Sequence, residues 1–126
     1  MEVAINPESE RFEKTDGRWR DQVVALVKDL REEGIDARTV DRPDPDALDK
    51  GPAAEIILAL GTSGAVSAAV TMFQAWLARD KTRFIEIVRR REDGSETSVT
   101  LRADNFDAKV FKEFAREERR DLGDAR

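Results

Sequence analysis

The stretch RFIEIVRRREDGSETSVTLR, from Arg83 to Arg102, decides the fold of this chain. Apolar and polar residues alternate on both sides of Asp93-Gly94, and a two-residue period is typical of β-strands. An Asp-Gly pair between two such runs is a strong signal for a β-hairpin. We therefore expect strands over residues 83–91 and 96–102, joined by a tight turn at Asp93-Gly94.

The segments around this hairpin supply further strands and helices. Residues 2–6 and 35–40 show short alternating patterns and are expected to be strands. Between them, apolar residues from Trp19 to Leu30 recur at spacings of three and four, which predicts an amphipathic helix. A last short helix is expected after Asp104, whose side chain can cap its first turn.

These elements predict an α+β domain of two layers, in the order β-α-β-α-β-β-α. Four strands would form a mixed sheet, with the helices packed mainly on one face. The chain has 126 residues, which fits one domain; we place it at residues 1–120, followed by a frayed charged tail at 121–126. The side chains expected to face the helices are Val3, Ile5, Ile85, Ile87, Val99 and Leu101.

The residue composition disfavours several kinds of chemistry. The net charge is -5, which argues against general nucleic-acid binding. Histidine and cysteine are absent, which removes the commonest general base, the usual zinc ligand and the Ser-His and Cys-His nucleophile pairs. We therefore expect a protein that is not an enzyme, with no catalytic residues, no metal site and no cofactor. The first residues lack the features of a secretory signal, so we expect a cytoplasmic location.

The segment from Ile56 to Phe73 is unusual in this charged chain, because it carries no charge and has small residues in its middle. Its length approaches that of a membrane span, but its Gly, Ser and Thr residues disfavour one. A nucleotide-binding turn at Gly61–Gly64 would have to follow a strand and open a helix. The chain has neither a G-x-G-x-x-G pattern nor a P-loop lysine there. A catalytic elbow at Ser63 would lack a histidine base.

The favoured interpretation of this segment is a mostly helical, water-soluble and buried stretch. Glycines inside a helix cost about 1 kcal/mol each relative to alanine, and close packing is the natural compensation. We therefore expect another group to lie against Gly64. A strand-to-helix turn at Gly61–Gly64 stays open as the alternative.

Several motifs, taken in their order, resemble one known family. They are LALGTSGA (58–65), QAWLARDK (74–81), RFIEIVRRREDGSETSVTLRA (83–103) and the helix after Asp104. Together they resemble the effector-associated constant component family of bacterial conflict systems. The resemblance is good from residue 58 onward and looser over the first helix and strand.

The resemblance implies a small non-enzymatic α+β protein that couples a variable effector to its regulation in a defence system. Its partner would be an effector or regulatory protein of the same system, with self-association open, and with no nucleic acid and no membrane span expected. The candidate contact residues are Trp19, Gly61, Gly64 and Trp76, although core packing is the competing interpretation of both tryptophans. The alternative function is a small-molecule or nucleotide-binding sensor that uses the Gly61–Gly64 turn.

Overall fold

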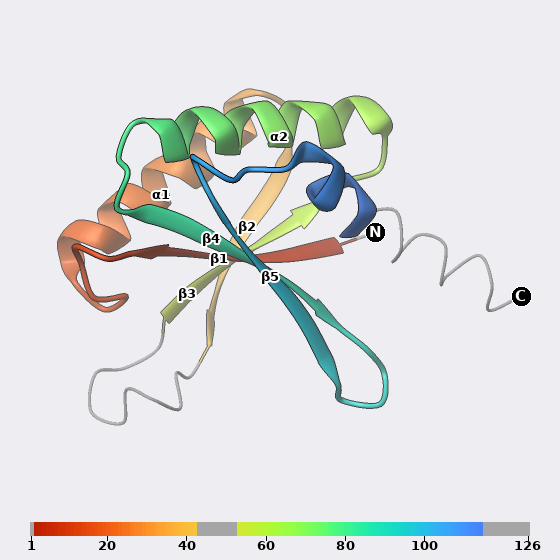
Figure 1. The fold of residues 1–126 in the computed structure, drawn as a ribbon, viewed down its shortest axis with the longest axis horizontal. Helices are drawn as coiled ribbons and strands as arrows, with labels where there is room; N and C mark the ends of the chain where they lie inside the picture. Colours follow the sequence, from red (N-terminus) through yellow and green to blue (C-terminus); the bar gives the residue numbers. More distant parts are fainter. Residues whose placement is uncertain (1, 43–52, 115–126) are drawn as a thin grey trace, which may run out of the picture.

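The computed structural model describes residues 2–42 and 53–114, and its fold is α+β, as the sequence predicts (Figure 1). The elements are β1 (Glu2–Ser9), α1 (Gly17–Glu32), β2 (Asp36–Arg42), β3 (Ala53–Ala59), α2 (Ser63–Ala78), β4 (Arg83–Arg90) and β5 (Glu96–Arg102). A short helical segment at residues 108–114 follows β5, where the last helix is expected. The domain end placed at residue 120 and the frayed tail at 121–126 lie outside the described residues.

The strands form one antiparallel sheet of five, in the order β2-β3-β1-β4-β5, rather than a mixed sheet of four. The additional strand is β3, part of which the sequence assigns to a helix. This strand lies between β2 and β1 and is covered on both faces: Ile56 and Leu58 are buried on one side, and Ile57 on the other. A strand buried on both faces reads as a continuous apolar run, which periodicity cannot distinguish from a helix.

The helices α1 and α2 cover the same face of the sheet (Figure 1). Asp16 caps the start of α1 by accepting a hydrogen bond from the Arg18 amide at 2.8 Å. Gly34 follows the end of α1 with a φ of 83°, a conformation that glycine adopts without steric cost. At the start of α2, Thr62 accepts a hydrogen bond from the Ala65 amide at 3.1 Å.

The main hydrophobic core lies between the helices and the sheet, and it contains all six side chains expected to face the helices. Five of them are buried, and Val99 is partly buried against the same core. From the helical side the core receives Trp19, Val23, Leu26, Val27, Leu30, Val70, Phe73, Trp76, Leu77 and Phe111.

The opposite face of the sheet carries a second, smaller apolar cluster, formed by Ala4, Ile57 and Val88. These residues lie in one row across β3, β1 and β4. Near this cluster, Arg90 donates two hydrogen bonds to the buried carboxylate of Glu55, at 3.0 and 2.8 Å. Arg90 also donates to Glu96 at 2.9 Å. The bonds to Glu55 raise the pKa of the Arg90 guanidinium above its ordinary value.

Candidate interaction surface

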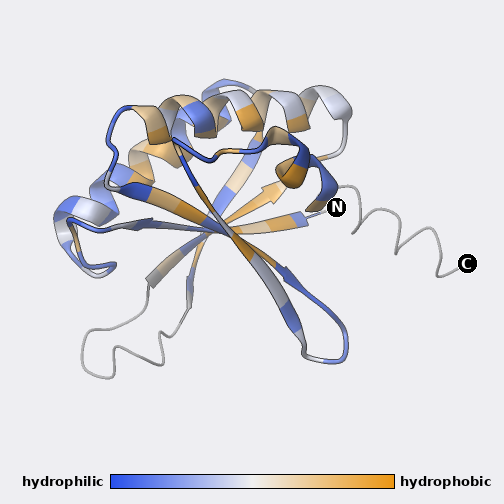
Figure 2. Ribbon diagram, viewed as in Figure 1, coloured by the Kyte–Doolittle hydropathy of each residue, from blue (hydrophilic) through white to orange (hydrophobic). Residues whose placement is uncertain are grey.

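The outer side of α2 differs from the rest of this charged protein. No charged residue occurs in the 16 residues of α2, whereas charges recur along α1. Figure 2 shows α2 mostly pale or orange, with more blue along α1. We call the exposed residues of this helix the α2 surface: Ser63, Gly64, Ser67, Thr71, Gln74, Ala75 and Ala78.

Helical geometry places the α2 surface away from the core. Positions three and four apart share one side of a helix, and the opposite side of α2 is buried through Ala69, Val70, Phe73, Trp76 and Leu77. The Thr71 hydroxyl donates to the Ser67 carbonyl at 3.1 Å, so its hydrogen-bonding capacity is partly used within the helix. The result is an exposed strip of small, uncharged side chains.

A partner protein can bind such a strip with only a small desolvation penalty. Burying charged groups carries a large desolvation penalty, and the centres of protein interfaces are accordingly depleted in charge. Small side chains also let the backbone of a partner approach closely. The α2 surface therefore has the chemistry of a contact surface.

The turn before α2 is a strand-to-helix turn rather than a helix interior, which is the alternative that the sequence leaves open. Gly61 and Gly64 are both exposed. A Cβ added at Gly61 would meet nothing within 4 Å, and one added at Gly64 would meet only the Thr62 hydroxyl, at 3.8 Å. The expectation that another group lies against Gly64 is therefore wrong for the folded chain. Contact of these glycines with a separate partner stays a prediction.

The two candidate tryptophans lie in the core rather than at the surface. Trp19 is 2% exposed and Trp76 is 5% exposed, and their ring centroids lie 5.7 Å apart. Arg83 lies over the Trp76 ring at 4.5 Å and donates to the Trp76 carbonyl at 2.8 Å. Partial burial lowers the pKa of Arg83. Of the two interpretations of the tryptophans, core packing is the one that the geometry fits.

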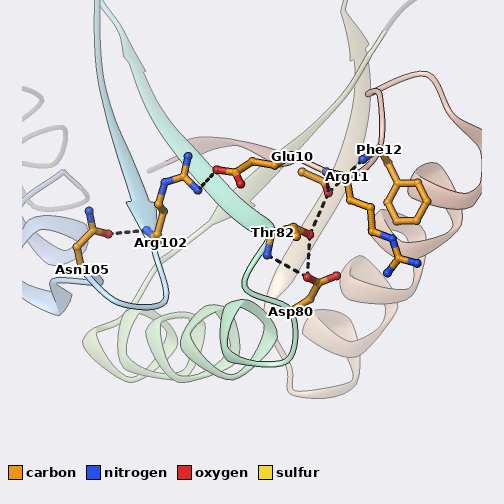
Figure 3. A network of polar contacts seen from close by, with 8 residues as sticks. Glu10, Arg11, Phe12, Asp80, Thr82, Arg102 and Asn105 are labelled. Carbon is orange, nitrogen blue, oxygen red and sulfur yellow. Dashed lines mark hydrogen bonds and ion pairs between the residues drawn. The ribbon is translucent and has the colours of Figure 1, made fainter.

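Sequence reasoning misses a polar network that joins the end of β1, the turn before β4 and the end of β5 (Figure 3). The Ser9 hydroxyl accepts from the Arg11 and Phe12 amides and lies 3.4 Å from the Thr82 hydroxyl. Thr82 in turn donates to Asp80 from its hydroxyl at 2.7 Å and from its amide at 2.9 Å. These bonds lower the pKa of Asp80.

The second arm of this network is formed by Arg102, which contacts Glu10 and shares hydrogen bonds with Asn105 (Figure 3). Residues 10 and 102 are 92 positions apart, so no local pattern could reveal the pair. Within each arm the polar groups bind one another, so the role of the network is to hold these segments of the fold together. Among the described residues, no three potential metal ligands cluster, and no helix is long and apolar enough to cross a bilayer.

The fold and the α2 surface together define a small two-layer α+β domain with one uncharged helix side exposed. The family Effector Associated Constant Component 1 matches residues 15–118, and the chain belongs to this family. This match confirms the resemblance seen in the sequence and includes α1 as well. No curated protein and no solved structure gives a match.

Proposed function

We propose that this protein is a non-enzymatic interaction module that couples an effector to its regulation in a bacterial defence system. Family membership is the observation that carries the proposal, because the family is described as a component associated with effectors. The partner is an effector or regulatory protein of the same system, and the expected location is the cytoplasm.

The α2 surface is the part of the domain that we assign to this partner. It supports the proposal because it is exposed and uncharged in a chain whose residues are 39% charged. A 16-residue helix is about 24 Å long, which is enough to present several turns to a partner. Elsewhere in the described chain the large aromatic side chains lie in the core or pack partly against it, except Phe84, whose ring is covered by Arg102 at 4.5 Å.

Co-purification with the effector encoded beside this gene tests the proposal, with a matched pair of variants. Ala75 on α2 and Ala25 on α1 are both exposed alanines on helices of 16 residues. Ala75→Arg should abolish co-purification, because it places a charge in the centre of the contact. Ala25→Arg should retain it, and both variants should melt within a few degrees of the wild type.

Two results would count against the proposal in different ways. Failure of the wild-type protein to bind any effector or regulator of its own gene cluster would refute the adaptor function. Wild-type binding that survives Ala75→Arg would refute the α2 surface as the contact while leaving the function in place.

A sensor function is the second candidate, and one observation favours it. The exposed Gly61–Gly64 turn joins a strand to a helix, which is the arrangement that a phosphate-binding turn requires. The turn contains no basic residue. Thermal melting with a nucleotide panel tests it: a ligand at 100 times its dissociation constant would stabilise the protein by about 2.7 kcal/mol. We expect no shift.

A further inference from the structure

Among the described residues, no strand pairs with the outer edge of β5, whose centre is open for backbone pairing. In antiparallel sheets, successive residues of an edge strand direct their N–H and C=O groups alternately toward the neighbouring strand and away from it. The Arg91 amide donates to the Ser95 carbonyl at 2.9 Å, so residues 97, 99 and 101 pair with β4. The backbone groups of Glu96, Ser98, Thr100 and Arg102 therefore point outward.

The end of β5 gives independent support for this assignment. Both backbone groups of Arg102 bond to Asn105 rather than to β4: its amide donates to the Asn105 side chain at 2.7 Å, and its carbonyl accepts from the Asn105 amide at 3.3 Å. No such partner is found within the described ranges for Ser98 and Thr100. The centre of the edge thus carries unpaired donors and acceptors.

The other edge of the sheet is protected, and β5 is not. Charged residues recur along β2, at Asp36, Arg38 and Asp41, and the Arg31 side chain donates to the Ala37 carbonyl at 2.7 Å. Charges along an edge strand discourage pairing with another chain. In β5, TSVT lies uncharged between Glu96 and Arg102, and it is rich in β-branched residues, which favour strand pairing.

We propose that a second copy of this chain pairs with β5 in antiparallel register, with the twofold axis at Val99. This register places Ser98 opposite Thr100 of the second copy, and Thr100 opposite Ser98 of the second copy. The outward N–H and C=O groups of both residues are then hydrogen-bonded across the interface. It also places the Glu96 side chain level with the Arg102 side chain of the second copy, at both ends of the interface. The Arg102 backbone stays bonded to Asn105, so the backbone pairing is limited to Ser98 and Thr100. Opposite charges and Ser–Thr pairs facing one another across strands are favourable.

The surroundings of β5 are compatible with this arrangement. The hairpin of β4 and β5 extends away from α2 (Figure 1). Glu96 and Arg102 already contact Arg90 and Glu10, respectively, yet their side chains are 55% and 35% exposed and can accept a further partner. Val99, which is partly buried in the single chain, would meet Val99 of the second copy. The product is a continuous sheet across two domains, and it does not involve the α2 surface.

Cysteine crosslinking tests the register directly, because the natural chain has no cysteine. Residues opposite one another in a non-hydrogen-bonded antiparallel pair have Cα atoms about 4.5 Å apart, within the range of a disulfide. Val99→Cys should therefore form a crosslinked dimer under mild oxidation. Thr97→Cys is the control: it is more exposed, yet its two copies would lie about 13 Å apart along the strands and should stay uncrosslinked.

Charge reversal tests the same register in the reduced protein, by sedimentation of the full chain. Glu96→Arg or Arg102→Glu alone should raise the dissociation constant of the dimer by roughly tenfold or more, since both end pairs become repulsive. The double variant restores opposite charges and should restore the dimer. Crosslinking of Thr97→Cys as readily as Val99→Cys, or a monomeric wild type at every concentration tested, would overturn the proposal. Effector binding is measured separately and does not decide it.

Discussion

Glu55 shows how a single residue can depend on the whole sheet. It is the only buried charged residue that the described part of the chain contains, with 2% exposure. Its hydrogen-bonding partner Arg90 is 35 positions away and on a different strand. Two charge-assisted bonds in parallel are stronger than neutral ones and also fix geometry. The pair therefore fixes how β4 lies relative to β3, although β1 separates them.

Removal of Arg90 should be costly because it leaves a buried carboxylate without this partner. We expect Arg90→Met to lower the free energy of unfolding by about 3 kcal/mol, the lower end for a broken buried pair, since the Arg90 side chain is 34% exposed. The double variant Glu55→Leu/Arg90→Met should be more stable than Arg90→Met alone. Urea denaturation measures both. A double variant that is less stable than Arg90→Met alone would contradict this reason, because Glu55 would then stabilise the protein without Arg90.

Acid should destabilise the protein partly through Asp80. Hydrogen bonds from Thr82 hold the pKa of this carboxyl below its usual 3.8 in the folded state. Its contribution to stability is complete above the unfolded pKa and is lost as pH falls through the lower, folded pKa. The melting temperature should therefore drop below about pH 4, and Asp80→Asn should make that drop shallower. A pH profile unchanged by the substitution would contradict this role.

At the scale of an element, the start of α2 gives a prediction about glycine. Gly64 is in a helical conformation with open space around it, so Gly64→Ala should raise the free energy of unfolding by about 0.5 kcal/mol. Gly34 is the control, because its φ of 83° is unfavourable for alanine, and Gly34→Ala should cost about 1 kcal/mol. Thermal melts of the two variants should shift in opposite directions. A loss of stability in both would mean that something packs against Gly64 after all.

The elements that the sequence predicts well are those with one buried face. In β4 and β5 the alternation is visible because one side of the hairpin meets the helices, and α1 shows helical spacing for the same reason. The strand β3 escapes prediction because Ile57 and Glu55 are buried on the far face, by contacts with residues distant in the chain. The α2 surface is also hard to predict, because a helix with uncharged residues on both sides has the same sequence pattern as a helix that is buried on all sides.

At the scale of the whole molecule, the segment after β5 is part of the domain. Phe111 is buried against Phe73 and Phe106, with ring centroids 6.0 and 6.4 Å apart. Phe111→Ala should lower the free energy of unfolding by about 3 kcal/mol, because it leaves a cavity beneath α2. Phe114→Ala, at a partly buried position, should cost less. Denaturation followed by tryptophan fluorescence would measure the free energy of unfolding of both variants. Equal and small decreases in the two variants would show that the segment contributes little to the stability of the domain.

The position of β1 in the sheet has a consequence for protein synthesis. This strand leaves the ribosome before every other strand, yet it lies in the middle of the sheet, between β3 and β4. The Asn6 side chain donates to Glu86, which is 80 residues later in the chain. At 5–20 residues per second, Glu86 is synthesised roughly 4–16 s after Asn6. During this interval the apolar residues of β1 are open to chaperones or to other nascent chains. Slower translation of the segment before residue 86 should therefore increase aggregation, and pulse-labelling of stalled chains can measure it.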